Sequence, residues 1–408
     1  MTALELRILA IQETDWVERN PIVHHRMLEE LSRRGADVTV IDFDIEWRSR
    51  VSAPVIQPRR ERRDVRRLYP DARIRLIRPA MVRLPLVGRL SWLAANALEL
   101  MALRPRPDIV VAYGISNAYL ALRFARRWRV PFVYHVMDAL HTHADAAIVR
   151  AIARDIECRV MRDADRVVVV SKGLAVYARE MGAPPARTEV IPIPANRVAP
   201  EPERGARVRG ALGVRDDEVM LLFAGWLYPF SGVRELLADL ARRRGELPWA
   251  RLVIVGDGEL APELRRLHQE AGLGEKAILT GRLPQSEVGG YIEAADICLV
   301  PARPVPVMRY LMPTKVVEYM ERGKCVIATR TPGMESEVGE LPGIVFTDGA
   351  TGVLDRVLEL AASGPARLRD EVRERGETCR RFIREREDWA AATNRFARVL
   401  ASLVSARA

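Results

Sequence analysis

The stretch from Pro313 to Thr329 reads Pro-Thr-Lys-Val-Val-Glu-Tyr-Met-Glu-Arg-Gly-Lys-Cys-Val-Ile-Ala-Thr. Proline and threonine suit the start of a helix, and Gly323 suits the left-handed residue that commonly follows a helix end. The apolar run 325–328 predicts a short buried strand. The stretch therefore predicts a helix, a glycine stop and one strand of a parallel sheet.

Three side chains of this predicted helix, Lys315, Glu318 and Tyr319, are three or four residues apart and can share one face. A cation beside a helix N-terminus suits a phosphate group. A carboxylate one turn further along can accept hydrogen bonds from two neighbouring hydroxyl groups. For the charged pair alone, the alternative is a solvated ion pair on an ordinary amphipathic helix.

The whole stretch resembles the P-x-K-x-x-E-Y-M-x-x-G-K-x-V-I-A-T signature of the retaining family-4 glycosyltransferases of the GT-B fold. The resemblance implies an α/β protein in which two doubly wound, parallel-sheet domains face each other across a cleft. It also implies that Glu318 holds the ribose hydroxyls of a nucleotide. The loop and helix start before it, with Arg309, Thr314 and Lys315, would hold the diphosphate.

The composition is that of a soluble globular protein, with 49% hydrophobic and 29% charged residues in a chain of 408, enough for two domains. The formal net charge is +10, and the basic residues are mostly arginine. This charge suits nucleic acid, an anionic membrane or a phosphorylated ligand. No nucleic-acid motif is visible, so that partner is not expected. Four scattered cysteines and no visible secretory signal or membrane span favour the cytoplasm.

The chain opens with a predicted strand at 7–12, a helix at 21–34 and a strand at 37–43, which is a βαβ start. In the resembled family the loop after the first strand meets the acceptor. We expect Asn20, His24 and His25 to orient an acceptor hydroxyl here. The alternative is that one histidine packs in the core and the other is solvated.

Two carboxylates, Asp42 and Asp44, follow the second strand, and we assign them to loop chemistry rather than to a metal site. A second polar cluster begins at the end of the predicted strand 131–136, and it includes His135 and Asp138. Ligands of open α/β sheets bind at such strand ends. The cluster resembles the family segment near the reacting sugar, so we expect Asp138 and His135 to be catalytic. The alternative is a carboxylate that merely caps the next helix. No metal is expected, because the histidine spacing defines no geometry.

The loop from Gly225 to Gly232 departs most clearly from the family form G-R-x-x-x-x-K-G, because Trp226 and Ser231 replace its two cations. One interpretation is that the backbone and Ser231 still hold phosphate, with Lys315 and Arg309 supplying charge. The other is that donor binding has been lost. Arg282 follows a predicted strand, and we expect it to stack on the nucleobase unless it is a plain surface arginine.

The predicted domains are an acceptor-binding domain at 1–200, a nucleotide-sugar domain at 201–380, and a helix at 381–408 that returns to the first domain. Residues 73–104 mix arginines with apolar residues. We expect this segment to lie at an anionic membrane surface, with Trp92 at headgroup level. The alternative is a helix packed on the sheet with an arginine-rich outer face.

The sequence therefore predicts a cytoplasmic, peripheral glycosyltransferase that needs no metal and no cofactor besides its co-substrate. It would move a sugar from a nucleoside diphosphate-sugar to a lipid-linked or glycan acceptor. A non-catalytic binding or scaffold protein of the same fold is the alternative, and the altered loop at Trp226 motivates it.

Overall fold

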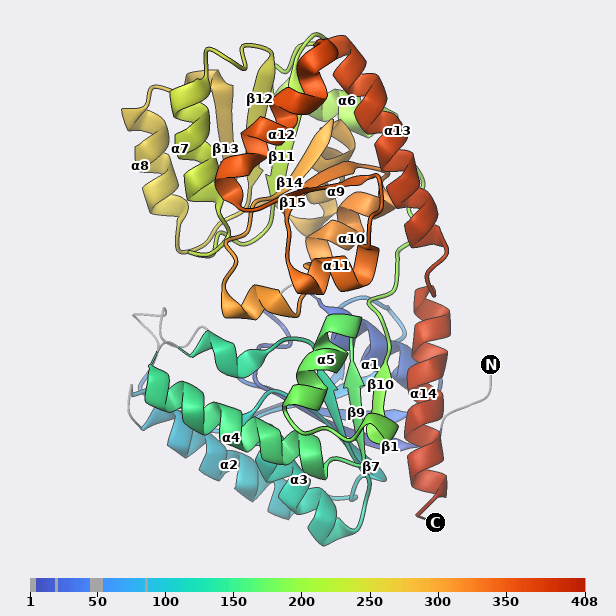
Figure 1. The fold of residues 1–408 in the computed structure, drawn as a ribbon. Coiled ribbons are helices and arrows are strands. Elements are labelled where there is room, and N and C mark those ends of the chain that lie inside the picture. Colours follow the sequence, from blue (N-terminus) through green and yellow to red (C-terminus); the bar gives the residue numbers. More distant parts are fainter. Residues whose placement is uncertain (1–4, 19–20, 45–53, 85–86, 145, 408) are drawn as a thin grey trace. The chain divides into compact units, whose positions relative to one another are not determined.

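The computed structural model describes residues 5–18, 21–44, 54–84, 87–144 and 146–407. The chain forms two compact units (Figure 1), which we call unit 1 (Met1–Ile193 with Trp389–Ala408) and unit 2 (Pro194–Asp388). The units therefore change at residues 193/194 and 388/389, whereas the sequence analysis placed the limits at 200/201 and 380/381. The chain passes into unit 2 soon after the last strand of unit 1.

Unit 1 contains an eight-stranded sheet in the order β10-β9-β8-β7-β1-β2-β5-β4. The described strand pairs are parallel except β4 with β5. The strands are β1 (Arg7–Gln12), β2 (Asp37–Ile41), β4 (Arg60–Val65), β5 (Ile74–Arg78), β7 (Ile109–Tyr113), β8 (Phe132–Val136), β9 (Arg166–Val169) and β10 (Thr188–Val190), with a separate ribbon of β3 (Ile56–Gln57) and β6 (Met81–Val82).

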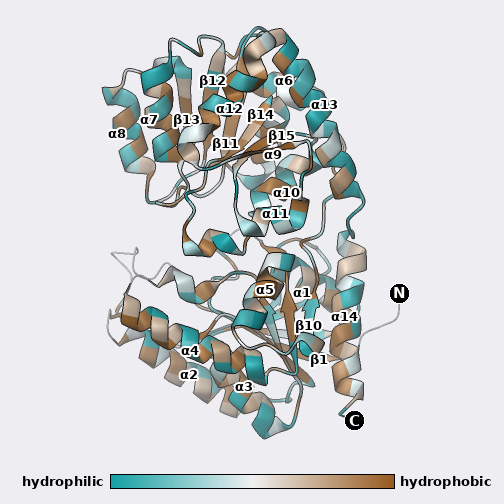
Figure 2. Cartoon of the chain, in the orientation of Figure 1, coloured by the Kyte–Doolittle hydropathy of each residue, from teal (hydrophilic) through white to brown (hydrophobic). Residues whose placement is uncertain are grey.

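The helices of unit 1 are α1 (Val23–Arg33), α2 (Gly88–Ala102), α3 (Ser116–Trp128), α4 (Ala147–Asp163), α5 (Lys172–Glu180) and α14 (Trp389–Ser405), with short 3-10 turns at Leu140–His143 and Pro185–Arg187. Buried side chains of α14, including Phe396 and Leu400, join those of α1 and strands β1 and β7 in one core. Figure 2 shows the mixture of apolar and polar residues along α14 that lets one of its faces pack.

Unit 2 contains a six-stranded parallel sheet in the order β13-β12-β11-β14-β15-β16. Its strands are β11 (Val219–Ala224), β12 (Ala250–Val255), β13 (Ala277–Gly281), β14 (Ile297–Val300), β15 (Cys325–Thr329) and β16 (Ile344–Thr347). Its helices are α6 (Pro202–Ala211), α7 (Val233–Arg243), α8 (Ala261–Glu270), α9 (Gln285–Ala294), α10 (Thr314–Glu321), α11 (Pro332–Val338), α12 (Val353–Leu360) and α13 (Pro365–Arg384), with 3-10 turns at Gly274–Lys276, Pro306–Arg309, Ala350–Gly352 and Ala361–Ser363.

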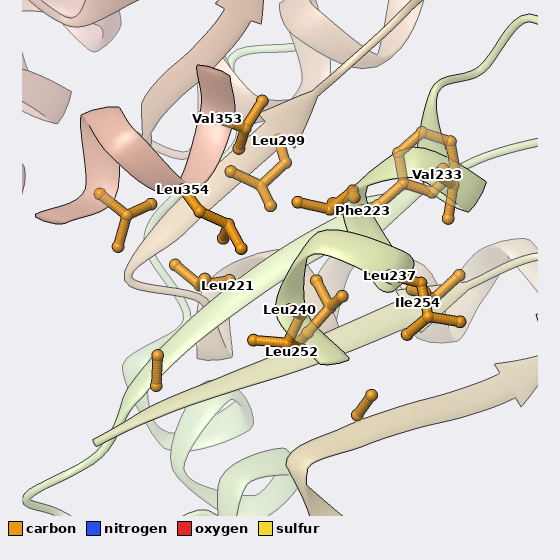
Figure 3. Packing of buried hydrophobic residues seen from close by; sticks show 14 of the residues in the cluster. Leu221, Phe223, Val233, Leu237, Leu240, Leu252, Ile254, Leu299, Val353 and Leu354 are labelled. Atoms are coloured by element: carbon orange, nitrogen blue, oxygen red, sulfur yellow. The ribbon is translucent and has the colours of Figure 1, made fainter. Parts of the chain in front are cut away.

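Each face of the unit 2 sheet has its own apolar core. Leu221 and Phe223 of β11 belong to one cluster, which Figure 3 shows, and Met220 and Leu222 belong to the other. A strand that buries both faces needs a continuous apolar run rather than an alternating one, which is the pattern of β11. The predicted fold class, an α/β protein with two doubly wound domains, is confirmed.

The stretch from Pro313 to Thr329 folds as predicted, with α10 after Pro313, Gly323 at φ +65° and strand β15 from Cys325. The expectation for Trp92 is wrong. Its ring is 1% exposed and packs against Phe43, at a centroid distance of 4.3 Å, in a small cluster with Met81. A large apolar ring with core neighbours is buried there rather than held at a membrane interface.

Candidate functional site

The first turn of α10 carries Lys315, whose ammonium lies 3.9 Å from the centre of the Phe223 ring at the end of β11. Burial disfavours the charged amine and lowers the pKa of Lys315 to about 8, although the nearby Glu318 carboxylate partly opposes this shift. Burial likewise raises the pKa of Glu318, and the nearby charges of Arg322 and Lys315 oppose this increase. The Lys315 and Glu318 side chains therefore lie in a partly desolvated environment.

Within the described residues, neither Lys315 nor Glu318 forms a side-chain hydrogen bond or ion pair. The helix that carries them is nevertheless firmly held. The Tyr319 hydroxyl accepts a 2.8 Å hydrogen bond from the Ala224 N–H and donates one of 3.2 Å to the Ala224 carbonyl. Tyr319 is fully buried, so it anchors α10 and does not join the other two on an open face. The site thus offers a cation and a carboxylate on a fixed helix.

The loop from Gly225 to Gly232 lies beside this pair. A Cβ atom on Gly225 (φ +148°) would be 2.7 Å from the Lys315 Nζ, so the lysine rests close against the loop backbone. Gly232 (φ +72°) precedes α7, and a Cβ there would meet the Pro301 carbonyl. Only glycine fits both constraints at this position. The loop therefore brings the N-terminus of a helix, an anion-binding element, to the end of β11.

The Ser231 hydroxyl is buried and has no hydrogen-bond partner in the described part of the chain. Trp226, at the place of a family cation, is 45% exposed, and its indole N–H donates a 2.8 Å hydrogen bond to Glu259. The rings of Tyr228 and Phe230 stack at 5.0 Å. The loop therefore offers aromatic surface, backbone N–H groups and one unpaired hydroxyl, but no side-chain cation of its own.

The other predicted donor residues are exposed. Thr314 is the first residue of α10, and Arg309 ends a 3-10 turn with its guanidinium 5.3 Å from the Tyr310 ring centre. Arg282 directly follows β13, and no contact within the described residues joins it to Lys315 or Glu318. The structure thus brings together Gly225 and Lys315.

In unit 1, Asp138 follows β8, and its Oδ1 accepts a 2.7 Å hydrogen bond from the Ala139 N–H. His135 is 2% exposed, and neither ring nitrogen has a partner in the described part of the chain. Burial lowers the pKa of His135 to about 3, so the ring is neutral. The structure thus places the two residues predicted as catalytic at the same strand end.

A residue that the sequence analysis missed holds the segment after β8. The Glu157 carboxylate is fully buried and accepts hydrogen bonds from the hydroxyls of Tyr177 (2.7 Å) and Tyr134 (3.2 Å). The Nδ1 of His141 lies 3.1 Å from the same carboxylate. Glu157 therefore fixes the turn that follows Asp138. No local pattern reveals this, because its partners come from three separate elements.

The two histidines of α1 differ in their surroundings. His25 stacks on Trp16 at 4.1 Å, and its ring nitrogens lie 3.2 Å from the Trp16 carbonyl and 3.3 Å from the Ile22 N–H. His24 is equally buried, but neither of its nitrogens has a partner within the described residues. His25 is thus occupied by the protein, whereas His24 is not. Asn20, the third predicted acceptor residue, lies outside the described residues.

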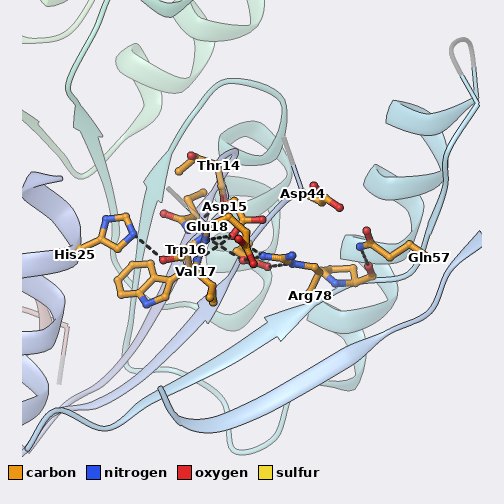
Figure 4. A network of polar contacts seen from close by, with 12 residues as sticks. Thr14, Asp15, Trp16, Val17, Glu18, His25, Asp44, Gln57 and Arg78 are labelled. Carbon is orange, nitrogen blue, oxygen red and sulfur yellow. Dashed lines mark hydrogen bonds and ion pairs between the residues drawn. The ribbon is translucent and has the colours of Figure 1, made fainter. Parts of the chain in front are cut away.

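The carboxylates after β2 belong to a buried ion-pair network, part of which Figure 4 shows. Asp42 and Asp15 lie 2.5 and 2.9 Å from the Arg78 guanidinium, and Asp44 lies 2.8 Å from that of Arg83. These contacts hold the loops after β1 and β2. Within the described residues, no group of three His, Cys, Asp or Glu side chains is placed to hold a metal ion.

Two family models match this chain. Residues 22–194 match the "Glycosyl transferase 4-like domain", and residues 218–363 match "Glycosyl transferases group 1". The first match covers the unit 1 sheet except strand β1, and the second covers the whole unit 2 sheet. The chain therefore belongs to the glycosyltransferases, and its two doubly wound units have the GT-B fold.

The names of the curated relatives refer to several different acceptors. A GDP-mannose-dependent alpha-(1-6)-phosphatidylinositol monomannoside mannosyltransferase of Mycolicibacterium smegmatis is 27% identical over 54% of this chain and 56% of its own length. TuaC of Bacillus subtilis, a putative teichuronic acid biosynthesis glycosyltransferase, is 27% identical over 78% of this chain and 79% of its own. For the first relative, the match therefore spans little more than half its length.

Solved structures share the fold at low sequence identity. HepE from Anabaena, in complex with UDP and glucose, has a TM-score of 0.72 at 16% identity, covering 98% of this chain and 100% of its own. Sucrose-phosphate synthase from Thermosynechococcus elongatus has a TM-score of 0.73 at 18% identity with the same coverage. Among the described residues there is no helix with the length and apolar character that a membrane crossing requires.

Proposed function

We propose that this protein transfers a sugar from a nucleoside diphosphate-sugar to a glycan or lipid-linked acceptor. One observation carries the proposal: α10 presents a lysine and a glutamate whose side chains form no hydrogen bond or ion pair within the described residues. Lys315 would contact the diphosphate, and Glu318 would accept hydrogen bonds from the ribose hydroxyls. An unpaired, partly desolvated charge is costly in a folded protein unless a ligand uses it.

The leaving diphosphate carries growing negative charge as the glycosidic bond breaks, and positioned donors stabilise it. In this proposal the donors are the Lys315 ammonium, the Ser231 hydroxyl and the N–H groups at the start of α7. Arg309 and Thr314 lie on the segment that leads into α10 and would supply further donors. The proposal assigns this stabilisation to protein groups and requires no metal ion. Retention of the anomeric configuration is proposed from the family resemblance.

The proposal assigns acceptor recognition to unit 1, with Asp138 and His135 in contact with the attacking hydroxyl. The neutral His135 ring and the Asp138 carboxylate can accept the hydrogen bond of an attacking hydroxyl. The names of the curated relatives, which include a phosphatidylinositol mannoside and teichuronic acid, support a glycan or lipid-linked acceptor.

We further propose that unit 1 docks on an anionic membrane surface from the cytoplasmic side. Leu90, Leu98 and Met101 of α2 are 68%, 62% and 55% exposed, and their spacing sets them along one side of the helix. Arg89 and Arg104 are exposed near its two ends. Apolar side chains flanked by arginines suit the headgroup region of an anionic bilayer.

Vesicle flotation tests the membrane proposal. Wild-type protein should float with phosphatidylglycerol vesicles at low salt, and binding should fall in 0.5 M salt because the ions screen the charges. The Leu90→Asp, Leu98→Asp double variant should stay in the soluble fraction. Val176→Asp, a change of another exposed apolar residue, should still float. Wild-type protein that never floats would end the proposal.

A non-catalytic scaffold is the second candidate, and Trp226 in place of a family cation favours it. A thermal-shift panel of UDP, GDP, ADP and TDP separates the two candidates. The transferase proposal expects at least one nucleotide to raise the melting temperature, and then transfer of labelled sugar from the matching donor to a membrane lipid extract. If no nucleotide stabilises the protein, the scaffold is favoured.

A further inference from the structure

Three adjacent strands of unit 1 end in a row of polar side chains. Gln12 of β1 is the register partner of Tyr113 of β7, and Tyr113 lies beside His135 of β8 at a ring distance of 5.2 Å. Register partners on parallel strands point to the same face of a sheet. The three side chains therefore lie side by side at the carboxyl edge of the sheet, where α/β proteins bind ligands.

Two helices extend the row. The His24 ring of α1 lies 4.6 Å from the Tyr113 ring, and the Phe396 ring of α14 lies 5.3 Å from the His135 ring. All five side chains are at most 4% exposed. We call Gln12, His24, Tyr113 and His135 the neutral row, with Phe396 as its apolar end.

Most polar atoms of the neutral row lack partners, the exception being the Gln12 Nε2, which donates a 3.1 Å hydrogen bond to the Thr14 carbonyl. Within the described residues, no hydrogen bond reaches the Tyr113 hydroxyl, the Gln12 Oε1, or any ring nitrogen of His24 and His135. Some nearby buried groups are paired, as are both His25 nitrogens and the Glu157 carboxylate, whereas the Trp16 indole N–H beside His24 is also without a partner in the described part of the chain. Buried polar groups are almost always paired, so a cluster of unpaired ones indicates that something else pairs them.

The neutral row also carries no charge. Burial lowers the pKa of His135 to about 3, lowers that of His24 well below its ordinary value, and raises that of Tyr113. Neutral imidazole and phenol groups both donate and accept hydrogen bonds, which suits hydroxyl groups. A phosphate or carboxylate in the same place would lose its hydration without gaining a countercharge.

We propose that the neutral row recognises uncharged hydroxyl groups of the acceptor, which identifies the acceptor as a neutral polyol or sugar ring at this point of contact. The proposal rests on the proposed transferase function and adds Gln12 and Tyr113 as specificity residues. One or two acceptor hydroxyls would be enough to form hydrogen bonds with the unpaired atoms of the neutral row. Phe396 would lie against the apolar edge of the ring.

Histidine NMR on the full chain tests the proposal without requiring activity. The protein is labelled with ¹⁵N-histidine, and His24→Gln and His135→Gln variants assign the two imidazole signals. Myo-inositol and methyl α-glucoside are the neutral probes, and glucuronate and inorganic phosphate are the charged ones. The neutral probes should shift both signals, and the charged probes should not.

Tyr113→Phe then removes one hydroxyl. Because that hydroxyl has no protein partner, the variant should melt no lower than the wild type, while the apparent Kd of the effective neutral probe rises about tenfold. Tyr69→Phe, whose hydroxyl accepts from Arg26, is the matched control and should leave this Kd unchanged.

The outcomes separate this proposal from the transferase proposal. If UDP raises the melting temperature but no neutral probe shifts the two histidine signals, the neutral-row proposal is overturned and the transferase proposal is not. Ordered waters that pair its atoms and stay in place in crystals soaked with the neutral probes would also overturn it. Histidine shifts without nucleotide binding would support the neutral row and count against the transferase.

Discussion

At the residue scale, the candidate site depends on side chains that the protein leaves unpaired. Lys315 and Glu318 lie one turn apart on α10, and within the described residues neither side chain forms a hydrogen bond or an ion pair. Burial shifts the pKa of each toward its neutral form. A bound diphosphate beside the ammonium would reverse the shift of the lysine, since an opposite charge favours the charged form.

The depressed pKa of Lys315, about 8, makes nucleotide binding depend on pH. A lowered lysine pKa means that the ammonium is present below about pH 8 and is lost as the pH rises through that value. The affinity for a nucleoside diphosphate should therefore fall about tenfold between pH 7 and pH 9. Lys315→Met should bind more weakly at pH 7 and lose this pH dependence.

Isothermal titration calorimetry at several pH values checks this prediction. Lys276→Met is the control, because the Lys276 amine is occupied by the Leu247 carbonyl and should not affect the nucleotide. Identical pH profiles for the wild type and Lys315→Met would show that the lysine does not contact the diphosphate.

The sequence predicted the placement of Lys315 and Glu318, because helical spacing fixes which residues share a face. It did not predict the roles of Tyr319 and His25. Tyr319 faces the core because Ala224, far away in sequence, offers both backbone hydrogen-bonding groups. His25 is occupied because Trp16 stacks on its ring. Such partners come from the tertiary fold, which local spacing does not encode.

At the element scale, the loop between β11 and α7 is the main departure from the family pattern. Its two glycines match those of the family form, and each has positive φ and leaves too little room for a Cβ atom. The cations are replaced by Trp226, which is bonded to Glu259, and by Ser231. Phosphate binding would therefore depend on backbone N–H groups, one hydroxyl and the lysine of α10.

The Ser231 hydroxyl gives a direct test of this loop. It is buried without a partner among the described residues, so Ser231→Ala should leave the free energy of unfolding unchanged or raise it slightly. If the hydroxyl donates to phosphate, the variant should lose about 1 kcal/mol of nucleotide binding. Urea unfolding and calorimetry measure the two quantities.

Ser402→Ala in α14 is the matched control, because its hydroxyl donates to the Val399 carbonyl within the helix. That change should leave nucleotide affinity as it is. A clear loss of stability in Ser231→Ala, with unchanged affinity, would mean that the hydroxyl is structural.

Helices and strands were easier to predict from the sequence than the tertiary contacts that their side chains make. The continuous apolar runs of β11 and β15 indicate buried parallel strands from sequence alone. Glu157 gave no signal, because its role depends on Tyr134, His141 and Tyr177 from other elements. Trp92 was misassigned for the same reason, since Phe43 and Met81 bury it.

At the scale of the whole molecule, the C-terminal helix α14 contributes buried side chains to the core of unit 1, which the N-terminal part of the chain forms. α14 belongs to unit 1, although all of unit 2 separates it in sequence from the rest of that unit. Its buried residues include Phe396, Val399 and Leu400. The sequence predicted this return only through the family resemblance, because an amphipathic helix does not reveal which core it joins.

Phe396→Ala should destabilise unit 1 by about 3–5 kcal/mol, the usual cost of removing a buried aromatic ring. Hydrogen exchange followed by mass spectrometry should show the loss in peptides of β1, β7 and α1. Arg398→Ala, an exposed change in the same helix, should alter stability by less than about 0.5 kcal/mol. Equal protection in the two variants would mean that α14 does not stabilise this core.

The central claim is that α10 holds a nucleoside diphosphate, with Glu318 on the ribose. Calorimetric titration of wild type, Glu318→Ala and the exposed control Glu359→Ala, with the nucleotide that stabilises the wild type, tests it most directly. The account predicts a loss of about 1–3 kcal/mol of binding free energy for Glu318→Ala and none for the control. Equal affinities for all three proteins would contradict it.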